Sequence, residues 1–478
     1  MYEELAGLAV RLAGELGCSY AEARVRRVRS LGVSLKNGEV EPARVYDGLG
    51  MGIRVVYEGA LAFSSINRME RGAVREAVER LVRRAKSVRR AKKVGMSDER
   101  MERARWGAEE REKLDRMGLE EMLKLLKELD GEVKGGFAGV EIPSRLLELE
   151  KEVEDRYLVN SDGAELWGHL PRVSFSSFLL LKLDGGFRSV TIPTGYSHLG
   201  GTGGWEVVKG WDLHSYLPDR VSKVCKHLKK AKGLEEGVMD VVIGPSIAGI
   251  VAHEACGHPS EADRILGREA AQAGESFLKP EDLGLRVGSE EANVSDDPTL
   301  KGSSGFYLYD DEGVRARKRE LIKDGVVNEF LQNRETAWEF GLGSNASARA
   351  ESFSSEPIVR MANTYVEPGD HSLEELVEGV KDGVLIESYM EWNIDDVRVN
   401  QRYVGLECYR IRNGRIGEEL KDVVLELKST DFWSKIDARG KELEFLSAYC
   451  GKGDPIQSVP VWTGGPYLRL KGVRVMSR

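Results

Sequence analysis

Hydrophobic and polar positions change their spacing several times along the chain, and each change marks an expected element. Residues 1–16, MYEELAGLAVRLAGEL, carry apolar side chains at helical spacing. Residues 34–66 alternate between apolar and polar, with turn signals at Asn37-Gly38 and Glu58-Gly59, which predicts a β-meander. Further helices are predicted near residues 67–93, 117–133, 217–231, 334–341, 372–381 and 429–437.

The grouping of these elements predicts the fold class. A second β-rich block extends to about residue 197, and the chain beyond residue 237 is mainly β. Hairpin turns are expected there at Asp324-Gly325, Asp382-Gly383 and Asn413-Gly414. Strands and helices cluster without regular βαβ alternation, which favours an α+β fold over a doubly wound sheet.

A polar, turn-rich stretch, KKAKGLEEG at residues 229–237, is a candidate domain boundary. A chain of 478 residues is too long for one ordinary core, so two domains are expected. We therefore expect an N-terminal α/β-layered domain over residues 1–230. A C-terminal β-rich domain over residues 231–478 would carry the helix with the histidine motif described below.

Composition and charge narrow the class of protein. The chain is 41% hydrophobic and 31% charged, as soluble globular proteins are, and no apolar run approaches the length of a membrane span. Its net charge of −9 argues against general nucleic-acid binding. Residues 80–93 are an exception, RLVRRAKSVRRAKK, but their apolar spacing favours an amphipathic helix with a basic solvated face. An acidic N-terminus and five scattered cysteines favour a cytoplasmic protein.

The segment HEACGH raises the question of a metal site. A helix beginning near Ser246 would carry His253 in its last turns, and His258 follows five positions later. On a straight α-helix these two side chains would point about 140° apart, unlike the pair in HExxH. A break at Gly257 and Pro259 would free His258, or one π-type turn would restore a shared face. Without either, His253 would end a core helix and His258 would be a loop residue.

Several pieces together carry a family resemblance. HEACGH and the C-terminal CGKGDPIQSVPVWTGGPYLRL are accompanied by YDDEG at residues 309–313, VRMANTY at 359–365 and GLGMGIRVV near the N-terminus. In this order they resemble the TldD/PmbA family of metalloproteases, historically called modulators of DNA gyrase. An intact HExxxH is similar to that of the TldD-type catalytic subunit. Pro259, Ile456 and Trp462 stand where the family often has glycine. The first bears on how His258 is placed, and the other two leave details of the substrate channel in doubt.

The resemblance implies a Zn²⁺ ion held by His253, His258 and Cys450. Three protein ligands leave the fourth position open for water, which is the arrangement of catalytic zinc. Glu254 would then be the general base, with a zinc-bound water as nucleophile. Cys256 is a rival ligand by its position, and we interpret it as a small buried thiol.

Other assignments stay open at this stage. Glu261 is expected to orient a ligand imidazole from behind. Asp310 and Asp311 would hold a substrate amine or shape a turn. Arg360 and Asn363 would contact the substrate backbone or make structural hydrogen bonds.

The leading hypothesis is a zinc-dependent peptidase that hydrolyses peptides or unstructured protein segments in an enclosed site. The resemblance implies a heterodimer with a PmbA/TldE-type paralogue, or else a homodimer. Charge and hydropathy predict no membrane partner and no direct nucleic-acid partner. The alternative is a non-proteolytic binding or regulatory partner with a structural or vestigial metal. An amidohydrolase acting on a small molecule would use the same chemistry.

Overall fold

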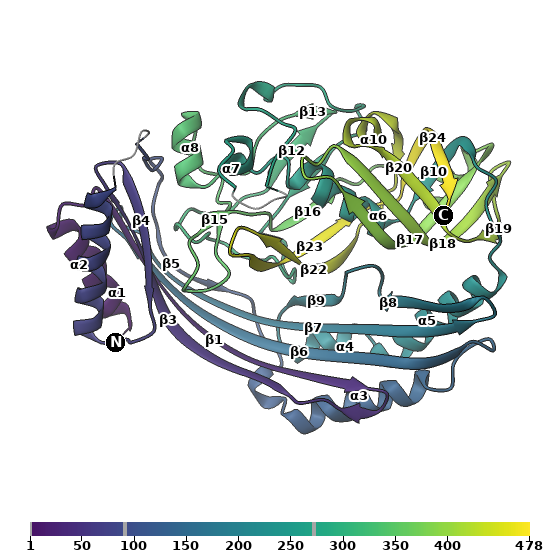
Figure 1. Ribbon diagram of the computed structural model, residues 1–478, viewed down its shortest axis with the longest axis horizontal. Coiled ribbons are helices and arrows are strands. Elements are labelled where there is room, and N and C mark those ends of the chain that lie inside the picture. Colours follow the sequence, from purple (N-terminus) through teal and green to yellow (C-terminus); the bar gives the residue numbers. More distant parts are fainter. Residues whose placement is uncertain (1, 89–92, 270–273) are drawn as a thin grey trace.

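The computed structural model describes residues 2–88, 93–269 and 274–478 (Figure 1). Its N-terminal part contains one nine-stranded sheet in the order β4-β3-β1-β6-β7-β5, with β2 beside β1 and both β8 and β9 beside β7. The strands are β1 (Tyr20–Lys36), β2 (Glu39–Val40), β3 (Arg44–Tyr57), β4 (Ala60–Ile66), β5 (Arg103–Gly107), β6 (Glu141–Asn160), β7 (Glu165–Leu183), β8 (Gly186–Ile192) and β9 (Leu199–Thr202). The longest strands curve beneath the rest of the molecule in Figure 1.

Helices cover this sheet at two places. Helices α1 (Tyr2–Glu15) and α2 (Arg71–Ser87) pack against each other and share one apolar core with β1 and β3. Helices α3 (Leu119–Val133), α4 (Trp205–Gly210) and α5 (Leu213–Lys230) contribute to a second core, with the short 3-10 helix η1 (Leu114–Arg116). In α1 the buried residues Leu5, Ala9 and Leu12 recur at helical spacing. Residues 89–92 of the predicted basic helix lie outside the described residues.

The C-terminal part contains two larger sheets. In the first, the order β10-β17-β18-β20-β24-β21 is closed on itself by pairing of β10 with β24, and β19 pairs with β18. Its strands are β10 (Gly237–Ile243), β17 (Asp382–Ile394), β18 (Asn400–Arg412), β19 (Arg415–Leu420), β20 (Val423–Lys428), β21 (Ile436–Arg439) and β24 (Leu468–Ser477).

The second sheet has the order β13-β12-β11-β16-β23-β22, so that β22 is an edge strand. Its strands are β11 (Val294–Asp296), β12 (Arg319–Lys323), β13 (Val326–Val327), β16 (Asn363–Val366), β22 (Glu444–Lys452) and β23 (Gln457–Gly465), and β14 (Ala348–Arg349) pairs separately with β15 (Ile358–Val359). A sheet-rich fold with helices is what the sequence pattern predicts.

Helix α6 (Pro245–Ala252) contacts both C-terminal sheets, through β16, β22 and β23 on one side and β17 on the other. All of its residues except Ser246 are buried, and Gly244 is the N-cap, with Pro245 in the first turn. The remaining helices are α7 (Ala262–Ile265), α8 (Arg334–Phe340), α9 (Leu373–Glu378), α10 (Ser429–Lys435), the π-helix η2 (His253–Gly257) and the 3-10 helix η3 (Pro280–Asp282). None of the helices in the described ranges is long and apolar enough to cross a membrane.

Most of the predicted turns are confirmed. Both residues have positive φ in each of four tight turns, Asn37-Gly38, Glu58-Gly59, Asp324-Gly325 and Asn413-Gly414. Asp382-Gly383 is an exception, because it begins β17 instead of turning a hairpin. A Cβ on Gly383 would collide with the carbonyl oxygen of Asp240 in β10, so this glycine permits a close strand approach.

Candidate metal centre

The helix that carries the histidine motif changes its winding where the motif begins. Helix α6 passes into the π-helix η2 at His253, and the N–H of His258 donates to the carbonyl oxygen of His253 at 3.0 Å. This i→i+5 hydrogen bond accommodates one extra residue per turn, so positions five apart share a face. The imidazole rings of His253 and His258 lie 4.9 Å apart between centroids. Of the two routes that the sequence left open, the chain uses the π turn.

The sequence suggested that Gly257 breaks the helix, but its role in the structure is to allow close packing of the π turn. It lies inside η2, and a Cβ built on it would overlap the sulfur of Met361, a fully buried side chain. Glycine is therefore required because the π turn presses directly against the segment before β16. Close packing, more than backbone freedom, accounts for this residue.

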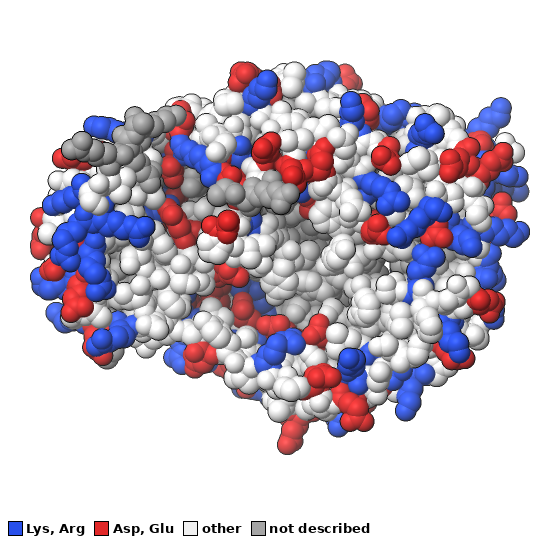
Figure 2. Space-filling model, in the orientation of Figure 1, with Lys and Arg blue, Asp and Glu red and all other residues white. Residues whose placement is uncertain are grey.

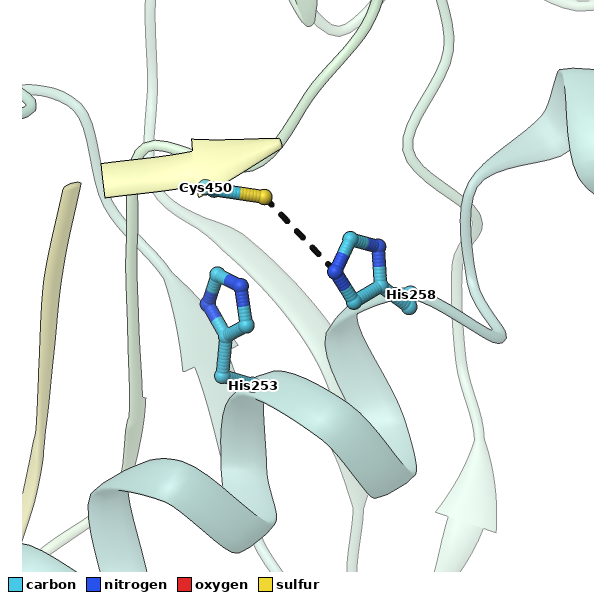
Figure 3. A group of neighbouring side chains, drawn as sticks. All are labelled: His253, His258 and Cys450. Atoms are coloured by element: carbon cyan, nitrogen blue, oxygen red, sulfur yellow. Dashed lines mark hydrogen bonds between the residues drawn. The ribbon is translucent and has the colours of Figure 1, made fainter. Parts of the chain in front are cut away.

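The edge strand β22 brings Cys450 to the two histidines (Figure 3). One ligand atom from each of His253, His258 and Cys450 lies within 4.8 Å of the others, and all three side chains are buried. Sγ of Cys450 is 3.6 Å from Nε2 of His258. In a tetrahedral zinc site, with Zn–N of about 2.0–2.1 Å and Zn–S of about 2.3 Å, such atoms lie about 3.6 Å apart.

The donor set also fits a metal by its chemistry. Nδ1 of His253 is buried without a hydrogen-bond partner among the described residues. Two imidazoles and a thiolate are the ligands that zinc prefers. The residues predicted as ligands are thus brought together with spacing and chemistry that suit the ion.

Neighbouring positive charges favour the deprotonated form of Cys450. Burial alone would raise the pKa of the Cys450 thiol, but His258, Arg360 and His253 together hold this pKa well below its usual range. Burial would likewise lower the pKa of His253, yet the negative charge of Cys450 beside it leaves that pKa raised. A thiolate is the form of cysteine that binds metals.

Glu261 supports His258 from behind, as the sequence predicts. Its carboxylate lies 2.9 Å from Nδ1 of His258, which directs Nε2 of that ring towards Cys450. Arg264 donates to the same carboxylate at 2.6 Å, and the buried amine of Lys452 lies 3.3 Å away. Burial opposes the charge on Glu261, but Lys452, His258 and Arg264 hold its pKa well below the usual range. Sequence reasoning missed Arg264 and Lys452, whose only signal is proximity to the motif and to Cys450.

Glu254 follows His253 and is also buried. Oε2 of its carboxylate accepts a hydrogen bond from Nη1 of Arg398, at the tip of the β17–β18 hairpin. This arginine was not found by sequence reasoning, since no motif surrounds it. The one available signal is physical, because a buried carboxylate requires a partner, but the sequence does not say which cation supplies it.

The remaining candidates have structural roles. Cys256 is a buried thiol outside the cluster, as interpreted from the sequence. Asp310 accepts backbone N–H groups of its own turn, and Asp311 accepts from Arg26 at 2.5 Å. Arg360 donates to the backbone oxygens of residues 450 and 457, and Asn363 also bonds to backbone groups. Of these four, only Arg360 lies beside the centre.

The free edge of β22 passes alongside this centre. His198 exchanges two backbone hydrogen bonds with Ser447, at 2.9 and 3.1 Å, so odd-numbered residues of β22 turn their N–H and C=O groups outwards. Beyond Ser447 these are Tyr449 and Gly451, on either side of Cys450. The ring of Tyr449 stacks on His198 with centroids 5.3 Å apart and is exposed.

A cavity of about 450 Å³ lies between the long sheet and the β22–β23 pair. Glu150, Glu152 and Arg172 line it from the sheet, and Tyr449 lines it from β22. The molecule is visibly hollowed on the face drawn in Figure 2, with acidic side chains along part of the rim.

Comparisons with known proteins agree over the whole chain. Residues 21–88, 112–228 and 236–477 match the models for domain 1, the central domain and the C-terminal domain of PmbA/TldA metallopeptidases. A metalloprotease of Methanocaldococcus jannaschii is 31% identical over 94% of this chain and 95% of its own length. A zinc metalloprotease TldD homolog of Saccharolobus solfataricus is 32% identical over 55% of this chain and 57% of its own. The crystal structure of TldE from Thermococcus kodakarensis has the same fold, with a TM-score of 0.76 and 15% identity over 99% of this chain and 100% of that one.

Proposed function

Because the chain belongs to the PmbA/TldD family of metallopeptidases, we propose that it is a zinc-dependent peptidase of the TldD catalytic type. Its substrates are peptides or unstructured protein segments. The observation that carries this proposal is the buried cluster of His253, His258 and Cys450 with Glu254 next to it in the chain. A structural zinc site would need the three ligands but not an adjacent buried carboxylate.

His253, His258 and Cys450 are the residues that would hold the ion. Zinc bound by them would supply the Lewis acidity that makes a water molecule reactive near neutral pH. Glu261 and Arg360 support this role because they hold His258 and the backbone of Cys450 in place.

Glu254 is the general base in this proposal. It accepts one proton as the oxygen of water bonds to the carbonyl carbon of the peptide. It then delivers this proton to the amine nitrogen as the carbon–nitrogen bond breaks, so that no other co-reactant is needed. Support comes from its position next to a ligand and from Oε1, which makes no hydrogen bond with the described residues.

We propose that substrates bind as an added strand along the edge of β22. The outward backbone groups of Tyr449 and Gly451 would pair with the substrate backbone, which gives affinity without strict sequence preference. This is supported by the pairing among the described residues, in which β22 has a partner strand only on the β23 side and its outer edge makes a single bridge, to His198. Burial of the ligands would exclude folded proteins.

We further propose a dimer, either with a PmbA/TldE-type paralogue or with a second copy of this chain. Val40, Val45 and Tyr46 on β2 and β3 are exposed, and a partner would remove such apolar surface from water. A cytoplasmic location is proposed because all five cysteines are free.

Substitution of the general base tests the function. Glu254→Gln should lower kcat on an unstructured fluorogenic peptide by about 10²- to 10⁴-fold, because proton transfer to a positioned base contributes that much. Zinc content should be unchanged. Glu281→Gln, at an exposed glutamate, should cleave like the wild type.

Equal cleavage by Glu254→Gln and wild type would remove Glu254 from this role. Absence of cleavage in the zinc-loaded wild type, even with a TldE-type partner present, would contradict the peptidase proposal and favour a binding or regulatory protein.

A further inference from the structure

The tip of the β17–β18 hairpin, residues 395–399, reaches the general base from 144 residues further along the chain. We propose that Arg398 at this tip is a positioning residue for proton transfer. Its guanidinium holds one oxygen of Glu254 and leaves the other to accept the proton of the attacking water. This inference rests on the proposed peptidase function and adds to it a residue outside the HExxxH and C-terminal motifs.

The ion pair is shielded from solvent. Arg398 is 8% exposed and Glu254 is 5% exposed. A carboxylate buried to this degree requires an opposite charge or strong hydrogen bonds, and Arg398 supplies both. Its Nε is also buried and has no partner among the described residues. The guanidinium therefore bonds to Glu254 through one nitrogen, Nη1.

Arg398 is the group that fixes the orientation of this carboxylate. Tyr389 and Tyr403 lie close enough for the charge of Glu254 to raise the pKa of each phenol, although burial is the larger cause. Yet the Tyr403 hydroxyl donates to Gln401 at 2.6 Å, and Glu254 has no other hydrogen bond with the described residues. Rotation about the last bond of a glutamate is soft, so without Arg398 the carboxylate would turn freely.

Backbone conformation and hydrogen bonds at the hairpin tip fix the position of Arg398. Arg398 has a φ of 65°, a left-handed conformation that is unfavourable for a non-glycine residue and that clusters at functional sites. Its N–H donates to the carbonyl oxygen of Asp395 at 3.1 Å, and its own carbonyl oxygen accepts from Ser429 at 2.7 Å. The side chain of Asp395 accepts from the N–H of Val399 at 2.7 Å and closes the turn.

The test compares variants at Arg398 with a control on the same hairpin. Arg398→Met should lower kcat about 100-fold, within the range attributed to a positioned base, while KM and zinc content stay within about twofold of wild type. Arg398→Lys, which keeps the charge on a more flexible side chain without the planar guanidinium, should lose about tenfold in kcat. Arg402→Met removes a partly exposed pairing with Glu391, 3.4 Å away, and should behave like wild type.

A second measurement does not depend on activity. In metal-free protein, Arg398→Met should lower the Tm, because it leaves the Glu254 charge buried without a partner. The same change made in the Glu254→Gln background should lower the Tm much less. This cycle reports the contact itself, whether or not the protein cleaves peptides.

The outcomes separate the two proposals. Wild-type kcat in Arg398→Lys, or in Arg398→Met, would overturn the positioning role while the peptidase function stands. Loss of zinc from the Arg398 variants would overturn it too, since the arginine would then serve the metal site. If Arg398→Met does not fold, the kcat of Arg398→Lys decides. A wild type that does not cleave overturns the proposed function, and the positioning role with it, even if the stability cycle confirms the ion pair.

Discussion

Glu261 carries its negative charge without contact with solvent, held by His258, Arg264 and Lys452. The same pattern recurs at Cys450, where neighbouring positive groups outweigh the cost of burial. At the scale of single residues, the site therefore depends on charged side chains. Burial disfavours their charged forms, and specific neighbouring groups stabilise them. Each such pairing can be broken by one substitution.

Glu261→Gln tests the support of the ligand His258. The amide removes the carboxylate that accepts from the imidazole, so zinc affinity should fall about 10- to 100-fold. Competition with a chromophoric chelator measures this, with circular dichroism to verify folding and Glu281→Gln as the control. Unchanged affinity in a folded variant would show that the carboxylate does not act on the ligand.

His198 makes a prediction about pH. Burial lowers its pKa from 6.5 to about 4, so the unfolded chain binds the proton at higher pH than the folded chain. Stability from the neutral ring is therefore complete above about pH 6.5 and is lost as the pH falls towards about 4. His198→Gln should lose less stability than wild type across this window in denaturant titrations. Equal losses, with the exposed His371→Gln as control, would contradict a neutral His198 ring in the folded chain.

At the scale of elements, the π-helix η2 decides whether the motif can form a site. Helix positions such as α3 at Leu119–Val133 follow from apolar spacing, which the sequence displays directly. For the helix at His253 the sequence allowed two conformations, a break or a π turn. It could not decide between them, because the outcome depends on packing against Met361. The hairpin tip with Arg398 could not be predicted, since residues 395–399 give no sign of which helix they meet.

Gly257→Ala tests that packing. The added methyl group would overlap Met361 inside a filled core, so the free energy of unfolding should fall by about 1 to 3 kcal/mol and zinc binding should weaken. Adding Met361→Ala should recover part of the zinc binding by making room. Gly131→Ala in α3, where a Cβ meets nothing within 4 Å, should be neutral or slightly stabilising. A Gly257→Ala protein as stable as wild type would show that the turn is not tightly confined.

At the scale of the whole molecule, the long sheet meets the C-terminal part of the chain through buried ion pairs. Arg54 in β3 donates to Glu22 at 2.9 Å and to Glu312 at 2.6 Å, and all three side chains are fully buried. We propose that residues 1–230 and 231–478 are two domains that this interface holds in a fixed relation. The sequence suggested the division through its polar boundary but gave no sign of the interface, because its partners are 258 residues apart.

Arg54→Met should therefore destabilise the protein by about 3 to 5 kcal/mol, because it leaves buried Glu312 without its cation and leaves Glu22 with the more distant Arg24, 3.6 Å away. Arg44→Met, which removes an exposed pairing with Glu148, should change stability by less than about 1 kcal/mol. Urea denaturation of both variants measures the difference. Similar small losses in the two would mean that the interface does not depend on this network.

We propose that one zinc ion lies between the π turn and the edge strand β22. The most direct measurement is an anomalous difference map from crystals of the zinc-loaded protein, collected on both sides of the zinc absorption edge. We predict one peak about 2.0 to 2.3 Å from His253, His258 and the sulfur of Cys450. A loaded crystal with no peak there, or with the zinc bound by other residues, would contradict the account.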